Sequence, residues 1–431
     1  MKSSKSVVFA VVVCLVAALA VRAAIPALNW PHFGYDDQLT SYAALEKTIT
    51  TQNVKNLKLA WSIGEENWSR AIYGSPAVYN NRLFTTAQGQ NLSAYDAETG
   101  DFVWQSEISE NNSASQPVIT TDGTLIYLAG NNPSSLYGLK ASSGKKIWQA
   151  PISFNISSLS KVIPAVDETR NTVYLLEGSY SSEGKLFALH RKSGKVLWYK
   201  SKTMGGVPFI GNYVLLKGSW IFARGVVEVN HMDMDKLARI NAGSKKVELY
   251  YTRPTTDMGW DIQSFAICND NLIVVYVNGF GFSETIKCIL CVYNISSSQI
   301  VWQKVFTTSN ITGAVACNTT KNIIYVPTDP YLFATNVKNG AQVWRYQGYG
   351  AILSPSVANG VVYFLSDTNL YAISETNKKR LFRYALGHEA DATTQVAVAN
   401  GMIYFSGSGG TRSLFALGFT GGPESPLRPV R

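Results

Sequence analysis

The chain has 431 residues, of which 46% are hydrophobic and only 16% are charged. This composition excludes a disordered chain and suits a β-rich fold with a large core. The formal net charge is +9, but the basic residues are scattered along the sequence, and no nucleic-acid motif is present. These features argue against a nucleic-acid-binding protein.

The N-terminus predicts a secretory signal peptide over residues 1–23. Lys2 and Lys5 precede an apolar run from Val7 to Ala20, and small residues follow it. This run is too short for a comfortable membrane span, and no later run is long enough. An uncleaved signal anchor is the alternative. Seven N-x-S/T sequons favour a glycoprotein that is secreted or held in the lumen of the secretory pathway.

Three similar phrases follow one another along the chain. They are LSAYDAETGDFVWQSE (92–107), LYGLKASSGKKIWQAP (136–151) and LFALHRKSGKVLWYK (186–200). Each follows two short apolar runs separated by a polar turn, as in SPAVYNNRLFTTA before the first phrase. The unit therefore has four strands in roughly 40–50 residues, which is the period of a propeller blade.

The same unit continues to the C-terminus. Seven complete units end on an outer strand that carries, in order, Trp104, Trp148, Trp198, Leu249, Trp302, Trp344 and Phe382. The eighth unit lacks its fourth strand, and the N-terminal strand 56–61 is predicted to supply it and so to close the ring. We therefore predict an all-β, eight-bladed β-propeller over residues 56–419. An N-terminal extension (24–55) precedes it, a tail (420–431) follows it, and a monomer is expected.

The tryptophans of the repeat have a structural explanation. A large ring on an outer strand packs well between neighbouring blades, and the preceding glycine permits a positive φ in the turn. We therefore assign a packing role to six tryptophans: Trp61, Trp104, Trp148, Trp198, Trp302 and Trp344.

Four cysteines follow the predicted signal peptide, namely Cys268, Cys288, Cys291 and Cys317. In an exported protein they permit two disulfides with three possible pairings, and buried thiols are an equal alternative. Cys288 and Cys291 face opposite sides of an extended strand, so a local redox or zinc motif is not expected.

The phrase AYDAETGDFVW resembles the repeat of propellers that bind pyrroloquinoline quinone (PQQ). The stretch NWPHFGYDDQLTSYAALEKTITTQNVKNLKLAW (29–61) is similar to the opening of quinoprotein alcohol dehydrogenases. The same superfamily contains the propeller lipoprotein of the bacterial outer-membrane barrel-assembly machine, which binds partners and is not an enzyme. The enzymes use an adjacent Cys–Cys pair, but this chain has none, and it also lacks the Arg that usually occurs near TSYAAL.

One stretch matches the catalytic region of those enzymes. DMGWDIQSFAICND (257–270) is similar to the D-x-W-D sequence that supplies their catalytic Asp. The resemblance implies that Asp261 is the base and that Trp260 and Asn278 contact the cofactor. An ordinary turn that enters a blade is the alternative explanation.

Longer loops are predicted in units three to five, including a 17-residue insertion at Ser219 to Asp235. Long loops on a rigid scaffold often carry function. They contain aromatic residues that the repeat does not require, which predict either a binding patch or a plug of the channel: Tyr180, Trp220, Phe222, Phe280 and Phe282. His231, Asp233 and Asp235 alternate in HMDMD and suggest a cation site, although a solvated loop explains them equally.

We therefore predict a non-catalytic scaffold that binds a protein or glycan on the face of units three to five. It uses no cofactor, binds no nucleic acid and has no membrane span. The alternative is a quinoprotein-like alcohol or sugar dehydrogenase that uses PQQ and calcium.

Overall fold

The computed structural model describes fourteen stretches of the chain. They are residues 29–64, 72–87, 92–106, 115–129, 134–152, 162–179, 182–201, 209–229, 232–251, 260–278, 287–307, 311–387, 394–407 and 413–420.

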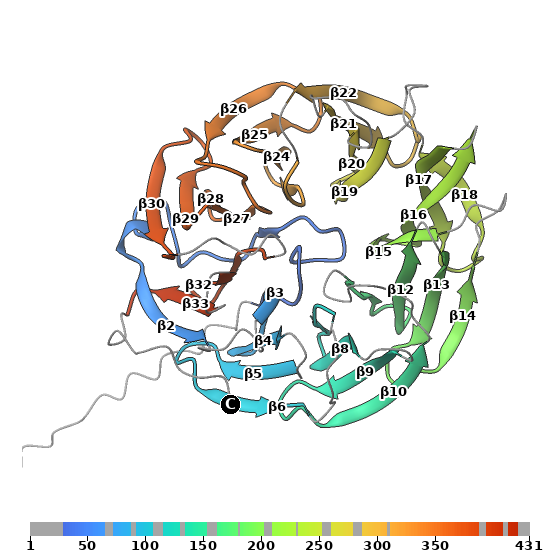
Figure 1. Cartoon of the computed structure of the whole chain (residues 1–431), viewed down its shortest axis with the longest axis horizontal. Coiled ribbons are helices and arrows are strands. Elements are labelled where there is room, and N and C mark those ends of the chain that lie inside the picture. The colour runs from blue at the N-terminus through green and yellow to red at the C-terminus, as the bar shows by residue number, and fades with distance from the viewer. Residues whose placement is uncertain are drawn as a thin grey trace, which may run out of the picture.

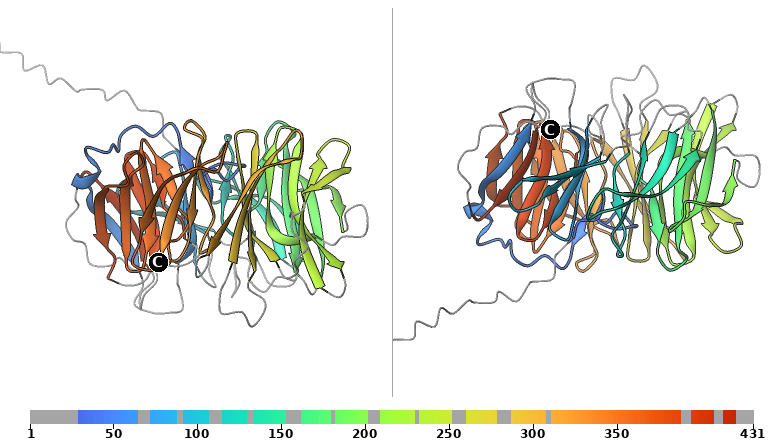
Figure 2. Two further views of the ribbon diagram at one scale, coloured as in Figure 1. Left: turned by 90° about the horizontal axis from the view of Figure 1, so that it is seen from above. Right: turned by 90° about the horizontal axis from the view of Figure 1, so that it is seen from below.

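The described residues form an all-β, propeller-like fold. Their one helical element is the 3-10 turn η1 (Val54–Asn56). The sheets surround a central axis, with the first strand of most sheets near the axis and the last strand at the circumference (Figure 1). Figure 2 shows that the strands run between the two faces of a disc. No helix within the described stretches has the length and hydrophobicity to cross a membrane.

Most of the sheets have four strands. Within each of these sheets the strands follow one another in chain order from the axis outwards. The first sheet contains β3 (Ile72–Tyr79), β4 (Arg82–Ala87), β5 (Leu92–Asp96) and β6 (Phe102–Gln105). The second contains β7 (Val118–Ile119), β8 (Thr124–Ala129), β9 (Ser134–Lys140) and β10 (Lys146–Ile152). Two later sheets contain β19 (Trp260–Cys268), β20 (Asn271–Asn278), β21 (Lys287–Asn294) and β22 (Ile300–Thr307), and then β23 (Ala316–Asn318), β24 (Ile323–Pro327), β25 (Tyr331–Asn336) and β26 (Gln342–Gln347).

An eight-stranded sheet lies between the second sheet and β19. It contains β11 (Ala165–Asp167), β12 (Thr172–Ser179), β13 (Ser182–His190), β14 (Val196–Lys200), β15 (Phe209–Lys217), β16 (Trp220–Val229), β17 (Met232–Asn241) and β18 (Val247–Tyr251). Its two halves, β11–β14 and β15–β18, are joined where Gly178 pairs with Gly211 and Gly184 pairs with Phe209.

The last two sheets each include a strand from the N-terminal region. One contains β27 (Ser356–Ala358), β28 (Val361–Ser366), β29 (Asn369–Ser374) and β30 (Arg380–Ala385), and β1 (Tyr42–Ala43) pairs with β27 in parallel. The other contains β31 (Ala397–Ala399), β32 (Met402–Gly407) and β33 (Ser413–Gly418), with β2 (Lys58–Gly64) antiparallel to β33. The N-terminal strand therefore joins the C-terminal sheet, as the sequence predicted.

The repeat tryptophans pack against turn glycines of the next sheet. Trp61 lies on Gly100, Trp104 on Gly144, Trp148 on Gly194 and Trp302 on Gly340, and all four glycines have a positive φ. The Trp104 indole N–H also donates to the Ala141 carbonyl at 3.0 Å. The predicted packing role is confirmed at these positions, because each ring covers a turn that a side chain would block.

Residues 30–43, here called the axial segment, cross the centre of the molecule (Figure 1). Backbone N–H groups on the innermost strands donate to its carbonyls: Ile119 to Pro31, Leu216 to Asp37, Ile267 to Gln38, Cys317 to Thr40 and Val357 to Ser41. Trp30 exchanges two backbone hydrogen bonds with Val78 of β3. The segment thus passes from sheet to sheet in chain order and pairs backbone groups that would otherwise be buried without partners.

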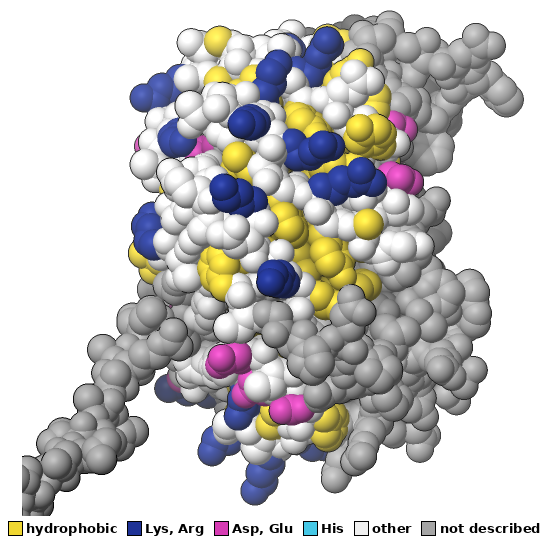
Figure 3. All heavy atoms as spheres, turned by 90° about the vertical axis from the view of Figure 1, so that its left-hand side faces the viewer, with side chains coloured by type: hydrophobic (Ala, Val, Ile, Leu, Met, Phe, Trp, Pro, Cys, Tyr) yellow, Lys and Arg dark blue, Asp and Glu magenta, His cyan; other side chains and the backbone are white. Residues whose placement is uncertain are grey.

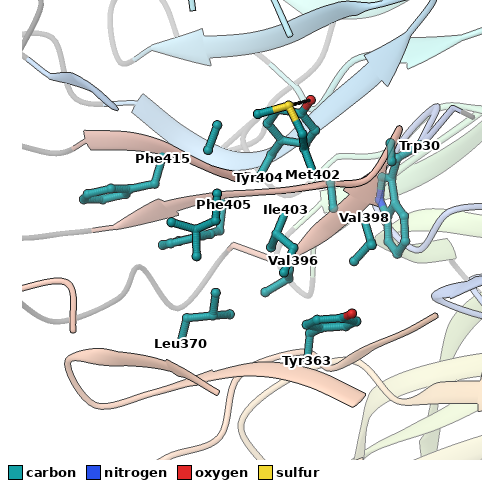
Figure 4. Packing of buried hydrophobic residues seen from close by; sticks show 14 of the residues in the cluster. Trp30, Tyr363, Leu370, Val396, Val398, Met402, Ile403, Tyr404, Phe405 and Phe415 are labelled. Atoms are coloured by element: carbon teal, nitrogen blue, oxygen red, sulfur yellow. Dashed lines mark hydrogen bonds between the residues drawn. The ribbon is translucent and has the colours of Figure 1, made fainter. Parts of the chain in front are cut away.

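The end of the axial segment and strand β2 share one hydrophobic cluster with the last two sheets. Trp30 is fully buried there, beside Val398 of β31 (Figure 4). Within this cluster the Tyr404 hydroxyl donates to the Met402 sulfur at 3.3 Å (Figure 4). Packing of this kind fixes the N-terminal region to the C-terminal sheets by hydrophobic burial.

One expectation about the loops needs correction. The 17-residue insertion at 219–235 is not a loop, because β16 and β17 pair from Trp220–Asn241 to Val229–Met232 as one long hairpin. Asn318 is buried and donates to Glu375, so a glycan does not fit at this sequon without disrupting the core.

A disulfide joins Cys268 at the end of β19 to Cys317 in β23, and Cys288 and Cys291 are buried thiols. One of the two possible disulfides therefore forms, across two neighbouring sheets.

Candidate functional site

A cluster of charged side chains lies where β16, β17 and β19 meet. Arg224 comes from β16, Asp235 from β17 and Asp261 from the second position of β19. Arg224 and Asp235 form a close ion pair, and the Arg224 Nη2 atom lies 4.0 Å from Asp261 Oδ1. The Arg224 guanidinium therefore lies within ion-pairing distance of both carboxylates.

The three side chains differ in their exposure. The Asp235 side chain is 0% exposed, that of Arg224 is 18% exposed and that of Asp261 is 27% exposed. Asp235 also accepts the backbone N–H of Ile262, which ties β17 to β19. Burial raises the pKa of Asp235 to about 6, although the charge of Arg224 and the Ile262 hydrogen bond oppose this shift.

Tyr213 supports the cluster from β15. Its ring stacks on Phe265 with centroids 4.5 Å apart, and its hydroxyl accepts the Phe265 N–H at 3.1 Å. Burial raises the pKa of Tyr213 to about 12, so this phenol stays protonated at neutral pH. The side chains at the junction are thus held by contacts on rigid strands.

The structure brings together three of the residues that the resemblance nominated. Trp260 pairs with Asn278 at the edge where β19 begins and β20 ends, and Asp261 is next to Trp260. For Trp260 and Asn278, the structure describes the positions in the strands and not the side chains. Asp235 adds a second carboxylate, which the sequence had assigned to a cation site rather than to this junction.

The predicted cation site is only partly within the described residues. His231 lies outside them, and Asp233 is described only by its position in β17, opposite Glu228. Asp235 faces Arg224 instead of a metal ligand set. No group of three or more His, Cys, Asp or Glu side chains suited to a metal ion occurs in the described stretches.

The predicted aromatic patch is also dispersed. Tyr180, Phe280 and Phe282 lie outside the described residues. Phe222 is fully buried in a hydrophobic cluster, so it cannot belong to an exposed surface. Trp220 begins β16, at the opposite end of the hairpin from Val229, and the Arg239 guanidinium lies 4.4 Å from its ring centroid. Trp220 therefore lies at the opposite end of β16 from the predicted face.

A second polar cluster, partly buried, lies within the axial segment. Asp36 accepts the Thr40 hydroxyl at 2.6 Å, and His32 Nε2 lies 4.0 Å from Asp37 Oδ1. Burial raises the pKa of Asp37 to about 6, and the neighbouring Asp36 and Asp167 add to this while His32 opposes it. These groups hold the segment's turn and face the innermost strands, since Val166 N–H donates to Asp37.

Sequence reasoning missed Arg224. The sequence feature that could have identified it is a single charged residue inside the apolar run WIFARGVV. A buried β-strand would otherwise carry no charge there. A buried charge in such a place requires a partner, and the alternating HMDMD sequence supplies one in the paired strand.

Comparisons with known proteins agree with this architecture. A family model described as outer membrane protein assembly factor BamB matches residues 46–259. Quinohemoprotein alcohol dehydrogenase of Comamonas testosteroni is 30% identical over 128 residues, which cover 28% of this chain and 18% of that protein. The dehydrogenase subunit of a quinone-dependent alcohol dehydrogenase of Gluconacetobacter polyoxogenes is 25% identical over 197 residues, or 39% of this chain and 25% of that one. The matched region thus spans a quarter or less of these relatives.

Solved structures show the same fold over most of the chain. The crystal structure of the Comamonas testosteroni enzyme has a TM-score of 0.69 at 12% identity, covering 93% of this chain and 82% of that one. The BamB structure from Moraxella catarrhalis has a TM-score of 0.60 at 14% identity, covering 83% of this chain and 99% of that one. The repeats, the fold and these relatives together lead to one conclusion: the chain belongs to the PQQ-repeat β-propeller superfamily.

Proposed function

We propose that this protein is a non-catalytic binding module, and the observation that carries this proposal is the pairing of Arg224 with Asp235 and Asp261. The resemblance nominates Asp261 as a catalytic base, but this carboxylate lies 4.0 Å from a guanidinium that already pairs with Asp235. A catalytic base must be placed to take a proton from its substrate, whereas Asp235 holds β16, β17 and β19 together and Asp261 lies beside the same guanidinium.

The same cluster does not suit calcium. Calcium takes six to eight oxygen ligands, mostly from carboxylates and carbonyls. Here the fixed positive charge of Arg224 occupies the position next to both carboxylates and competes for their oxygens. The described residues around Asp261 therefore fit an ion pair and do not fit the calcium that would accompany PQQ.

The proposed scaffold is an eight-bladed ring. The two halves of the eight-stranded sheet each repeat the four-strand order of the other sheets, which supports counting them as two blades. Closure by β2 is supported by hydrogen bonds between the last and first sheets, from Trp61 Nε1 to the Ala97 carbonyl and from Gln395 N–H to Ser75 Oγ. Such a ring presents rigid faces for a partner.

The partner in this proposal is a protein or a glycan. It would dock on the face where β17 and β19 begin, in an exported, PQQ-free protein whose signal peptide is residues 1–23. The alternative remains a PQQ- and calcium-dependent alcohol or sugar dehydrogenase. Its support is the adjacency of Trp260, Asp261 and Asn278 and the likeness to the Comamonas testosteroni enzyme.

Reconstitution separates the two functions. The purified protein is incubated with PQQ and calcium, and dye-linked oxidation of primary alcohols and aldoses is followed. We expect no oxidation above that of the Asp261→Asn variant. PQQ-dependent turnover that Asp261→Asn abolishes would establish the dehydrogenase and refute the binding module.

The binding role has its own test. A glycan array and capture of proteins from the organism's secreted fraction are compared for the native chain and for a Phe280→Ala/Phe282→Ala variant. We expect a specific ligand whose retention falls in the variant, with unchanged thermal unfolding. Equal retention of the ligand by both proteins would show that the binding surface does not include these loops.

A further inference from the structure

Two neighbouring outer strands, β26 and β30, carry a concentration of exposed basic side chains. Six of them form what we call the basic wall: Lys338, Arg345, Lys378, Lys379, Arg380 and Arg383. All six are exposed and lie on the two strands or in the turns that lead into them. Figure 3 shows this side of the molecule, where Lys and Arg side chains stand among apolar and uncharged ones.

The basic wall has almost no acidic counterpart. Asp367 and Glu375 are the only acidic residues between positions 331 and 385. Glu375 is buried and binds Lys321, the Tyr325 hydroxyl and the Asn318 amide. Asp367 lies in the β28–β29 turn, away from the turn that leads into β30. Within the described stretches no Asp or Glu forms an ion pair with any residue of the basic wall, so its charge faces solvent.

A groove of about 520 Å³ crosses the basic wall between β26 and the turn before β30. Its polar lining comes from Gln342, Arg345, Thr376, Asn377 and Lys378. These groups are amides, a hydroxyl and two cations, and no carboxylate is among the lining residues. They are complementary to a ligand that carries hydroxyls together with an anionic group.

The groove is built on fixed backbone. The Trp344 indole donates to the Glu375 carbonyl at 2.7 Å, which joins β26 to the turn of the next sheet. Within the turn, Lys378 N–H donates to the Ser374 carbonyl at 2.9 Å and Lys379 N–H to Asn377 Oδ1 at 3.1 Å. Arg345 is further held over the ring of Tyr331, at 4.6 Å from its centroid. The cations therefore project from a pre-organised surface.

We propose that the basic wall binds an acidic polysaccharide, with an anionic sugar unit seated in the groove between Arg345 and Lys378. A membrane surface is disfavoured because the exposed apolar residue of the groove, Val343, is flanked by Gln342 and Trp344 on a strand and does not protrude on a loop. Single-stranded nucleic acid is disfavoured because it requires several aromatic stacking platforms. The exposed Tyr349 stacks on Tyr371, which already covers one of its faces.

This proposal concerns a surface away from Arg224 and Asp261, and it holds whether the protein is a binding module or a dehydrogenase. Carboxylated and sulfated sugars share the chemistry that the groove recognises, so the ligand class includes both.

The test measures binding of the full-length protein to fluorescein-labelled heparin, as a sulfated polysaccharide, and to labelled polygalacturonate, as a carboxylated one. Fluorescence polarisation is recorded from 50 to 300 mM NaCl. An Arg345→Ser/Lys378→Ser variant removes the two cations of the groove. The matched control is Lys145→Ser/Lys146→Ser, which removes two lysines from the equivalent turn of the second sheet. Both variants are first checked for unchanged thermal unfolding.

We expect one or both polysaccharides to bind, and the groove variant to lose about tenfold in affinity, with a salt dependence shallower by about one to two in log–log slope. The control variant should stay within about twofold, because it lies outside the groove. Tighter binding of heparin would identify sulfate as the anion, and tighter binding of polygalacturonate would identify carboxylate.

Three results would overturn the proposal. They are absence of binding to both polysaccharides at 50 mM NaCl, an equal loss in the control variant, and tighter binding of single-stranded DNA or of phosphatidylserine vesicles than of either polysaccharide.

Discussion

Trp104 lies directly on Gly144, so that a Cβ atom at Gly144 would be 2.5 Å from the Cε3 atom of the indole. The two residues belong to adjacent sheets, and the same relationship recurs between Trp61 and Gly100 and between Trp148 and Gly194. The contact between adjacent sheets is therefore made by an indole ring that packs on a turn glycine, which has no side chain. This explains why a glycine stands four residues before Trp104 and four residues before Trp148.

Gly144→Ala should destabilise the protein by about 2–4 kcal/mol, because the new methyl group meets the indole and the backbone keeps a positive φ. Urea unfolding followed by tryptophan fluorescence measures the change. Gly218→Ala is the matched control, since Gly218 has a φ of 58° and nothing lies within 4 Å of its Cβ position. The control should lose only about 1 kcal/mol. Equal losses would show that the indole contact is not what excludes a side chain.

Asp235→Asn should cost roughly 2–3 kcal/mol, because it removes the buried carboxylate that pairs closely with the Arg224 guanidinium in a mostly buried site. Asp261→Asn should change stability by less than about 1 kcal/mol, since this carboxylate is 27% exposed and lies 4.0 Å from the Arg224 guanidinium. The comparison is made by urea unfolding at pH 7. A larger loss for Asp261 than for Asp235 would contradict the assigned ion pair.

Asp37→Asn should reduce the dependence of stability on pH. The folded pKa of Asp37 is about 6, above the value of about 3.9 for an unfolded chain, so the folded state binds this proton more tightly. The stability that protonation contributes is complete below about pH 4 and is lost as the pH rises through 6.

Asparagine is neutral throughout this range and keeps an oxygen for the Val166 N–H. The difference in unfolding free energy between pH 4.5 and pH 7 should therefore shrink in the variant by less than about 2 kcal/mol, because the Asp37 side chain is 39% exposed and solvent screens its interactions. An unchanged difference would mean that Asp37 does not titrate in this window.

Denaturation without a reductant should expose the thiols of Cys288 and Cys291 but not those of Cys268 and Cys317. Alkylation followed by peptide mass spectrometry identifies the labelled residues. A Cys268→Ser/Cys317→Ser variant should lose about 2–4 kcal/mol, because the bridge closes a long segment between two sheets. Labelling of all four cysteines before reduction would show that the disulfide is not formed.

Local patterns carried much of the prediction. Alternating strands, polar turns and the Gly-to-Trp spacing are short-range features, so the four-strand unit and the packing role of Trp104 and Trp148 followed from sequence alone. The strand predicted at 56–61 is β2 at Lys58–Gly64, paired with β33. Its pairing with the last unit was predicted by counting strands, because the sequence of the strand does not identify its partner strand.

Long-range and backbone features were not predictable in the same way. The axial segment is held by carbonyls such as those of Gln38 and Thr40, which every residue possesses, so its sequence gives no sign of these bonds. The 219–235 stretch was assigned to a loop because it exceeds the usual length of the unit, although its alternation is that of a long hairpin. The pairing of Cys268 with Cys317 stayed open since three pairings were equally consistent with the spacing.

The most direct test of the binding-module account is calorimetric titration of the purified protein with PQQ, with and without calcium. Because Arg224 already pairs with Asp235 and lies 4.0 Å from Asp261, the account predicts no binding heat in either condition. It also predicts that Arg224→Gln does not create a calcium-dependent PQQ site, because it removes a strand-joining contact and supplies no carboxylate. Micromolar or tighter binding that requires calcium and is weakened by Asp261→Ala would contradict the account and establish a quinoprotein site.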